Sequence, residues 1–346
     1  MTIEHKISTL VLWSEEIKLQ IANSKLDVDS DLKQIMLKAY YHNNWFTEEN
    51  ILLALNNICN EFLDEKKLEE WIQKYSPFIN NGELVEPQQP KTIGITMAGN
   101  LPLVGFHDLL CVLVSNHTAM IKLSSKDNLL LPYLLNILFA IEPEFKKRII
   151  ISEMLKGADA YIATGSNNSA RYFEHYFGKY PNIIRKNRTS IALLDGSETD
   201  EDIMNLGKDV FTYFGLGCRN IGKIYITKSF DLQRLLRVFE NYNHLADHVK
   251  YRNNYDYQLT ILLMNKTVCL VNDCIIVTED KSIHSPLSVL YFEVVENLND
   301  ALKDLNMADI QCIVGKNHIP FGQSQIPTLS DYADDIDTMK WICELS

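Results

Sequence analysis

A cysteine between a glycine and an arginine is the first candidate for chemistry in this chain. Cys218 lies in the segment FTYFGLGCRN (residues 211–220), behind a Gly-Leu-Gly turn and directly before an expected strand. Glycine permits backbone conformations that let an amide or a ligand come close, which suits an exposed thiol. Arg219 can favour the thiolate, the nucleophilic form. The residues alone leave two interpretations open, a catalytic nucleophile and a structural turn cysteine.

Asn100 follows the first expected strand of the α/β region, in the segment MAGNLP. Its side-chain amide can donate a hydrogen bond to the oxyanion that forms when a thiolate attacks a carbonyl. Asparagine before Leu-Pro also suits an N-cap or a turn. From the residues alone the turn is the better interpretation, and the oxyanion role stays open.

Two later segments carry groups that bind phosphate or ribose oxygens. Hydroxyl and ammonium side chains end and follow the expected strand TAMIKL, at Lys122, Ser124, Ser125 and Lys126. Gly165 and Ser166, in IATGSNN, occupy a strand-to-helix turn, where free amides favour a phosphate. A solvated loop is the alternative for the first segment. The G-x-G-x-x-G fingerprint of a standard Rossmann phosphate loop is absent.

Charge and cysteine usage exclude several classes of function. The 346 residues carry a formal net charge of -12, so we expect no general attraction to nucleic acid or to an anionic membrane surface. The 7 cysteines are odd in number and form no CxxC pair, which favours neither a disulfide framework nor a zinc site. His244 and His248 have the spacing of two ligands on one helix face, but no third ligand accompanies them, so no metal is expected.

The N-terminal residues have no pattern of a targeting segment. Glu4, Glu15 and Glu16 interrupt the apolar stretch, which excludes the apolar core of a signal peptide. No run of about 18 apolar residues, the length that crosses a bilayer as a helix, occurs along the chain. We therefore expect a cytoplasmic protein without a membrane span.

Hydrophobic periodicity divides the chain into four parts. Residues 1–84 space their apolar side chains at three and four, which predicts a helical N-terminal region. Residues 85–189 alternate strand and helix patterns, which predicts a parallel sheet with helices on both faces and a ligand site beyond the carboxyl ends of its strands. Residues 190–315 repeat this alternation, with strands expected at SIALLD, IGKIYIT, LTILLM, CIIVT, LSVLYFEVV and IQCIV. Residues 316–346 form a less regular tail that returns to the body.

Taken in this order, MAGNLP, MIKLSS, IATGS and FGLGC resemble motifs of the aldehyde dehydrogenase superfamily. The text around them is similar to the acyl-CoA reductase branch, the LuxC family of fatty-acid reductases. The similarity covers roughly residues 85–315. It implies an aldehyde dehydrogenase-like α/β fold of two Rossmann-like domains with a helical N-terminal region, in which residues 85–189 bind NAD(P) and residues 190–315 carry the catalytic cysteine.

The resemblance also implies roles for the candidate residues. Cys218 becomes the nucleophile, and Asn100 becomes an oxyanion donor alongside the Cys218 backbone amide. The cofactor's ribose and phosphates fall to Lys122, Ser124, Ser125 and Lys126, and Gly165 and Ser166 form the turn beside its pyrophosphate.

Three departures from the superfamily pattern refine the expected activity. No carboxylate lies between Glu174 and Asp195, where oxidising members carry the glutamate that activates water, so an acyl-enzyme should persist until a hydride arrives. Ser125 stands where NAD-preferring members often have a glutamate, and Lys126 follows, which favours NADPH over NADH. Ser282, in SIHSPL, stands where a glutamate contacts the nicotinamide ribose in the superfamily.

These features lead to one expected activity, with alternatives. The chain is expected to reduce an acyl-CoA, or an acyl group on a carrier, to the aldehyde through a Cys218 thioester, with NADPH as donor and NADH as the alternative. The remaining interpretations are a reductase of another activated acyl group such as an acyl phosphate, an acyltransferase, and a non-catalytic acyl-binding or cofactor-binding subunit. A homo-oligomer or a fatty-acid reductase complex is the expected assembly.

Overall fold

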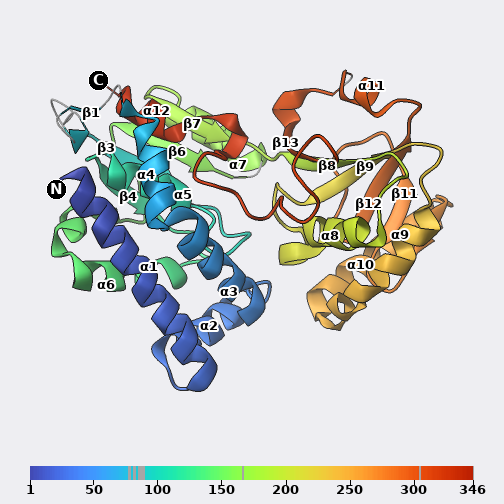
Figure 1. Ribbon diagram of the computed structural model, residues 1–346, viewed down its shortest axis with the longest axis horizontal. Helices are drawn as coiled ribbons and strands as arrows, with labels where there is room; N and C mark the ends of the chain where they lie inside the picture. Colours follow the sequence, from blue (N-terminus) through green and yellow to red (C-terminus); the bar gives the residue numbers. More distant parts are fainter. Residues whose placement is uncertain (77–78, 81–82, 85–89, 166, 304, 346) are drawn as a thin grey trace. The chain divides into compact units, whose positions relative to one another are not determined.

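The chain forms two compact units in a computed structural model, which describes residues 1–76, 79–80, 83–84, 90–165, 167–303 and 305–345 (Figure 1). Unit 1 comprises Met1–Lys186 and Pro327–Ser346, and unit 2 comprises Asn187–Ile326. The tail expected from residue 316 is thus divided, because its first part belongs to unit 2 and its remainder to unit 1. Along the described part of the chain, no helix is both long and apolar enough to cross a membrane.

Helices form the N-terminal part of unit 1, as the periodicity predicts. They are α1 (Ile3–Leu26), α2 (Asp31–His42), α3 (Glu48–Asn57), which continues into a π-helical turn at Ile58–Phe62, and α4 (Glu65–Gln73). The side chains of Thr2, Thr47 and Asp64 accept amide hydrogen bonds at the starts of α1, α3 and α4, which satisfies donors that a first turn leaves unpaired. Trp13 and Trp71 are buried in one core with the adjoining sheet, so these helices are part of unit 1.

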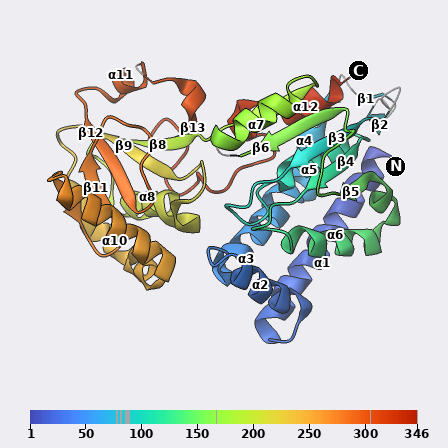
Figure 2. The ribbon, with the colours of Figure 1, turned by 180° about the vertical axis from the view of Figure 1, so that it is seen from behind.

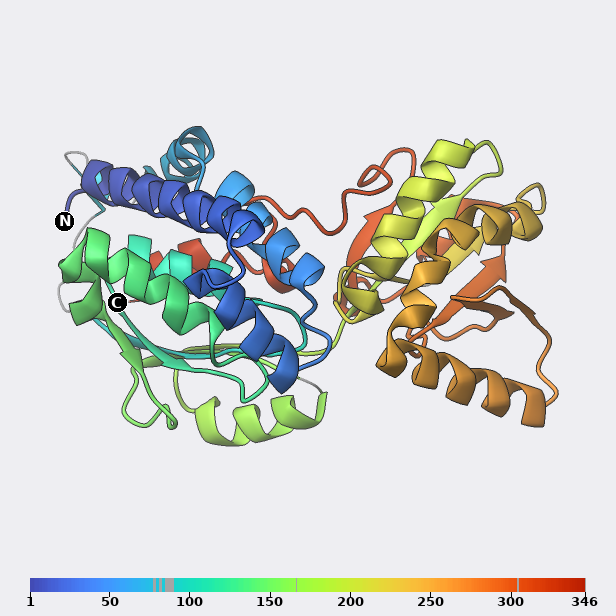
Figure 3. The same cartoon turned by 90° about the horizontal axis from the view of Figure 1, so that it is seen from below.

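A five-stranded parallel sheet with the order β5-β4-β3-β6-β7 follows. Its strands are β3 (Thr92–Thr96), β4 (Thr118–Lys122), β5 (Ile149–Ile151), β6 (Ala160–Thr164) and β7 (Asn182–Arg185). Its helices are α5 (Phe106–Val114), α6 (Leu130–Ile141) and α7 (Asn167–Phe177), and a short hairpin, β1 (Ile79–Asn80) with β2 (Glu83–Leu84), precedes them. Figure 3 shows α7, in yellow-green, on one face of this sheet and α1 and α6 on the other, and Figure 2 shows α1 beside α6 from behind.

Unit 2 is built on a six-stranded sheet with the order β10-β11-β12-β9-β8-β13, parallel except for the edge strand β10. Its strands are β8 (Thr189–Leu194), β9 (Ile221–Ile226), β10 (Cys269–Val271), β11 (Ile276–Glu279), β12 (Val289–Val294) and β13 (Ile310–Val314). Its α-helices are α8 (Asp200–Phe211), α9 (Leu232–Phe239), α10 (Val249–Met264) and α11 (Leu298–Lys303). Ala192 and Leu194 pack with α8 and α9, whereas Ile191 and Leu193 pack with α11, so β8 is buried on both faces and reads as a continuous apolar run.

The expectation of a strand at LTILLM was wrong. These residues, 259–264, are the last part of α10, which begins after His248. Tyr255, Leu259 and Leu262 recur at spacings of four and three and pack together against β11 and β12. A short apolar run does not distinguish strand from helix, and here the helical spacing decides, because it packs three side chains against the sheet from one face.

The C-terminal segment is anchored to unit 1 through a buried ion pair. Arg185, at the end of β7, makes a two-pronged contact with Asp108 of α5 at 2.5 and 2.9 Å, and both side chains are almost fully buried. Arg185 also donates to Thr338 Oγ1 at 2.9 Å, at the start of α12 (Thr338–Cys343).

Shorter 3₁₀ turns lie at Pro143–Arg148, Thr212–Gly215, Glu240–Asp247, Met307–Asp309 and Ala333–Asp335.

Candidate active site

Two loops meet at the carboxyl ends of β3 and β4. Met97 N donates to Lys122 O at 3.0 Å, so the two segments stay paired beyond β3. Gly99 then lies against Ser124, because a methyl group on Gly99 would stand only 2.7 Å from Ser124 Cβ. The structure thereby brings five of the predicted site residues to the ends of neighbouring strands or the loops that follow them: Asn100, Lys122, Ser124, Ser125 and Lys126. All of these except the half-buried Ser124 are exposed.

Asp127 ties these two loops together. Leu103, which adopts a left-handed φ of 58°, donates its amide to Asp127 Oδ2 at 2.8 Å. Asp127 N in turn donates to Ser124 O at 3.1 Å, and Lys126 N donates to Ser124 Oγ at 3.2 Å. Burial raises the pKa of Asp127 to about 6, although the amides of Leu103 and Leu130 oppose the shift. The loop that carries Asn100 is therefore held to the loop that carries Lys126.

Gly165 lies at the carboxyl end of β6, the strand beside β3. A Cβ at this position would stand 2.8 Å from Ser169 Cβ and 3.0 Å from Phe173, so only glycine lets α7 begin this close to the strand. The first turn of α7 has amides without helical partners, which suits a phosphate. Ser166, the other residue expected here, lies outside the described residues. The glycine cradle and the exposed Lys122 and Lys126 fit a dinucleotide cofactor at this edge.

Cys218 belongs to unit 2, whereas the other predicted site residues belong to unit 1. All seven cysteines are free and lie in the described part of the chain, and Cys218 alone among them is exposed. Burial raises the pKa of the Cys59 and Cys111 thiols and raises that of Cys274 and Cys343 to about 12, which makes these four poor nucleophiles at neutral pH. Cys218 is therefore the best placed thiol for chemistry.

Asn220, only 5% exposed, holds the turn around Cys218. Its Nδ2 donates to the carbonyls of Asp209, Val210 and Thr212 at 3.0, 3.3 and 2.9 Å. Its Oδ1 accepts the amide of Gly217 at 2.8 Å. One side chain thus connects the end of α8 to the residue before the cysteine.

Two further contacts complete the support of this turn. The buried Ser190, on β8, donates its hydroxyl to Cys218 O at 2.8 Å. Arg219 Nε donates to Ser324 O at 2.5 Å, so the guanidinium binds the returning chain. Asp209, fully buried, accepts the amides of Gly322 and Ser324 at 2.6 and 2.9 Å, which ties that chain to α8 as well.

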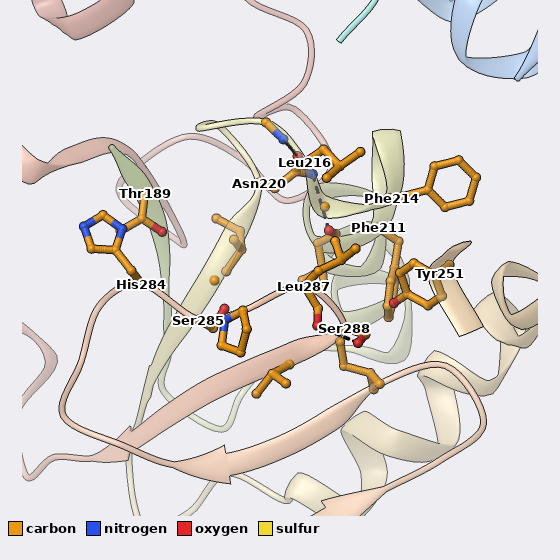
Figure 4. A pocket seen from close by; sticks show the side chains of 18 of the residues that line it. Thr189, Phe211, Phe214, Leu216, Asn220, Tyr251, His284, Ser285, Leu287 and Ser288 are labelled. Carbon is orange, nitrogen blue, oxygen red and sulfur yellow. Dashed lines mark hydrogen bonds between the residues drawn. The ribbon is translucent and has the colours of Figure 1, made fainter. Parts of the chain in front are cut away.

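The turn borders a pocket of about 240 Å³ that lies wholly within unit 2 (Figure 4). Its apolar walls include Phe214, Leu216, Tyr251 and Leu287, and its polar lining includes Arg188, Thr189, Asn220, His284 and Ser285. The pocket lies at the amino ends of β8, β9 and β12, because Thr189, Ile221 and Val289 begin these parallel strands. A ligand site beyond the carboxyl ends of parallel strands is thus found for the candidate residues of unit 1, whereas the pocket of unit 2 lies at the amino ends of its strands.

The two histidines with ligand-like spacing, His244 and His248, lie in a 3₁₀ turn and at the cap of the helix that follows it. His248 caps α10, because its Nδ1 accepts the amide of Tyr251 at 3.3 Å, and its ring packs on Phe214 at 4.5 Å between centroids. His244 lies in the 3₁₀ turn before it. Within the described residues, no group of three or more histidine, cysteine or acidic side chains could hold a metal ion.

Sequence reasoning missed the residues that support the site: Asp127, Ser190 and Asn220. The partners of Asp127 and Asn220 are backbone groups, which no sequence motif records. An acidic residue after a Ser-Ser-Lys loop and an asparagine two residues after the cysteine were the available signals. Ser282, expected near the nicotinamide, is exposed and accompanies the pocket-lining His284 and Ser285 on one segment.

No protein-family model and no curated protein matches this chain. Solved structures match it over most of its length. Aldehyde dehydrogenase 21 from Physcomitrella patens, solved with the reaction product succinate, is 12% identical with a TM-score of 0.62, and the match covers 91% of this chain and 74% of that one. Betaine aldehyde dehydrogenase from Staphylococcus aureus, solved with NAD⁺, is 11% identical with a TM-score of 0.63, covering 88% and 68%. An NADP-dependent enzyme from E. coli is 9% identical with a TM-score of 0.64, covering 91% and 73%.

These likenesses confirm the expected fold class. The overall fold is shared with proteins that have only about a tenth of the residues in common with this chain. Sequence identity this low establishes the fold only, and the reaction has to be argued from the site residues. The chain has the aldehyde dehydrogenase-like fold.

Proposed function

We propose that this chain is an NAD(P)H-dependent acyl-CoA reductase of the LuxC type, in which Cys218 carries the acyl group as a thioester. The observation that carries the proposal is the exposed Cys218 thiol, on a turn that Asn220 and Ser190 hold beside a pocket with apolar walls. The aldehyde dehydrogenase-like fold supports an oxidoreductase that uses a nicotinamide cofactor. The candidate cofactor loops of unit 1 support the same conclusion.

The first half of the reaction is acyl transfer to the protein. The Cys218 thiolate attacks the carbonyl carbon of the acyl-CoA, and the bond to the CoA sulfur breaks when the tetrahedral intermediate collapses. CoA leaves as a thiolate and takes a proton from solvent. Asn100 donates a hydrogen bond to the oxyanion of this intermediate, which lowers the barrier because the negative charge develops on that oxygen.

The second half is reduction and release. A bound nicotinamide dinucleotide supplies the hydride that the acyl carbon needs. Asn100 donates a hydrogen bond to the oxygen of the resulting hemithioacetal, as it does to the first oxyanion. Cys218 then leaves as a thiolate, the carbonyl forms again, and the aldehyde is released.

The missing carboxylate favours reduction over hydrolysis. No aspartate or glutamate occurs between Glu174 and Asp195, a stretch that includes all of β7 and β8. An acyl-enzyme without a general base to activate water is hydrolysed slowly. The thioester on Cys218 therefore persists until it is reduced.

The cofactor loops favour NADPH as the donor. Ser125 and Lys126 are exposed beside Lys122 at the carboxyl ends of β3 and β4. An ammonium group near the adenosine ribose attracts a 2′-phosphate, and a serine does not repel it. Gly165 and the start of α7 receive the pyrophosphate.

Intact-mass measurement tests the proposal. The protein is mixed with long-chain, medium-chain or short-chain acyl-CoA, and NADPH is then added. We expect an adduct of one acyl group that disappears on addition of NADPH, with release of aldehyde. Cys218→Ala should form no adduct, whereas Cys269→Ala, which removes a half-buried thiol of the same unit, should behave as the wild type. Absence of an adduct with every acyl-CoA, or an adduct that survives Cys218→Ala, would refute the proposal.

A further inference from the structure

Glu153 is the second residue after β5, at the same edge of unit 1 as the cofactor loops. β5 runs parallel to β4 with Ile151 opposite Ile121, and Ser152 N donates to Ile121 O at 2.8 Å. The backbone is thus paired up to the residue before Glu153. Glu153 comes after β5 just as Leu123 and Ser124 come after β4, so both segments leave the sheet at its carboxyl edge.

A local turn sets the backbone position of Glu153. Ser152 Oγ donates to Met154 O at 2.8 Å and accepts the amide of Met154 at 3.3 Å, so both neighbours of Glu153 are tied to each other. Leu155, two residues further, is buried in a small core with Tyr161. Glu153 itself is exposed. The turn therefore presents a carboxylate at this edge on a supported backbone.

The edge thus carries charges of both signs on adjacent strands. Lys122 and Lys126 are exposed at the end of β4 and in the loop after it, and Glu153 is exposed at the end of β5. In doubly wound sheets an acidic side chain beyond a strand end accepts hydrogen bonds from the ribose hydroxyls of a dinucleotide, and a basic side chain there accommodates a 2′-phosphate. A carboxylate and an ammonium group at one ribose have opposite preferences.

We propose that Glu153 faces the adenosine ribose of the cofactor and, in opposition to Lys126, sets the choice between NADH and NADPH. Glu153 supplies from β5 the carboxylate that the loop after β4 lacks at Ser125. The chain then uses both cofactors, because Glu153 recognises the free 2′-hydroxyl and Lys126 the 2′-phosphate. This inference rests on the proposed function, since it assumes that the edge binds a nicotinamide dinucleotide.

Direct binding of the two cofactors tests this inference without turnover. The dissociation constants of the full chain for NADH and NADPH are measured by nucleotide fluorescence. We expect Glu153→Gln to shift the ratio of the two constants about tenfold or more toward NADPH, because a hydrogen bond to a charged group is lost for NADH and a repulsion is removed for NADPH. Lys126→Gln should shift the ratio the opposite way.

The matched control is Glu144→Gln, which removes the same charge from an exposed position in the 3₁₀ turn before β5, at the opposite end of that strand. It should leave the ratio unchanged. A wild-type chain that binds cofactor, with a Glu153→Gln ratio within about twofold of the wild type, would overturn the role of Glu153 and leave the reductase proposal standing. A wild-type chain that binds neither cofactor would overturn both.

Discussion

Replacing Asn220 with alanine tests whether the turn that carries Cys218 depends on one side chain. Asn220 is buried, its side-chain amide donates to three carbonyls, and its side-chain oxygen accepts the Gly217 amide. Its two amide hydrogens are shared among the three carbonyls, so the variant loses about three hydrogen bonds. At about 1 kcal/mol each, with some cost for groups left unpaired, the free energy of unfolding should fall by about 2–4 kcal/mol. That is a large part of the 5–15 kcal/mol that stabilises a typical domain.

Asn220→Ala should slow the acylation of Cys218 by acyl-CoA more than it changes the accessibility of the thiol. Cys218 is already exposed, so its alkylation by iodoacetamide should continue at a similar rate in Asn220→Ala. Acylation by acyl-CoA needs the thiolate in one geometry, and a displacement of about 1 Å costs on the order of a hundredfold in rate. We therefore expect acylation to slow by about ten- to a hundredfold while alkylation is retained.

Urea unfolding and intact-mass kinetics measure the two effects. The unfolding midpoint should fall by about 1 M or more, given the usual dependence of stability on urea. Asn241→Ala is the matched control, because Asn241 donates one exposed hydrogen bond, to Val238 O at 2.8 Å, and its removal should cost less than about 0.5 kcal/mol. An Asn220→Ala variant with the midpoint and acylation rate of the wild type would show that the turn holds itself, and the reasoning would be refuted.

Two further predictions concern the loops of unit 1. Asn100→Ala should slow acylation of Cys218 by about 10²–10³, and a wild-type rate would exclude Asn100 as an oxyanion donor. Burial raises the pKa of Asp127 to about 6 from 3.8, so the folded chain binds the proton of this carboxyl group more tightly than the unfolded chain does. The protonated Asp127 therefore contributes stability below about pH 4, and this contribution is lost as the pH rises through about 6. Asp127→Asn should therefore stabilise unit 1 near neutral pH by up to about 3 kcal/mol more than at pH about 4, and equal effects in urea unfolding at the two pH values would contradict this sign.

The local pattern of the chain determined most of the elements. Apolar runs and turn residues predicted β3, β4, α5, α6 and β6, because these segments are buried whatever their partners are. LTILLM failed as a strand because a six-residue apolar run fits either period, and the stripe of α10 that decides it begins earlier, at Tyr255. β7 was not anticipated, because its burial alternates over only four residues.

The candidate residues divide in the same way between sequence and structure. Motif order pointed to Cys218, Asn100 and Lys122 because the chemistry of a nucleophile, an oxyanion donor and a phosphate ligand depends on residue type, which the sequence records. Only the tertiary structure decided that Cys218 is the one exposed thiol among the seven, that Asn220 and Ser190 hold its turn, and that Glu153 shares an edge with Lys122. Burial, hydrogen bonds to backbone groups and strand order join residues far apart along the chain, and no local pattern carries that information.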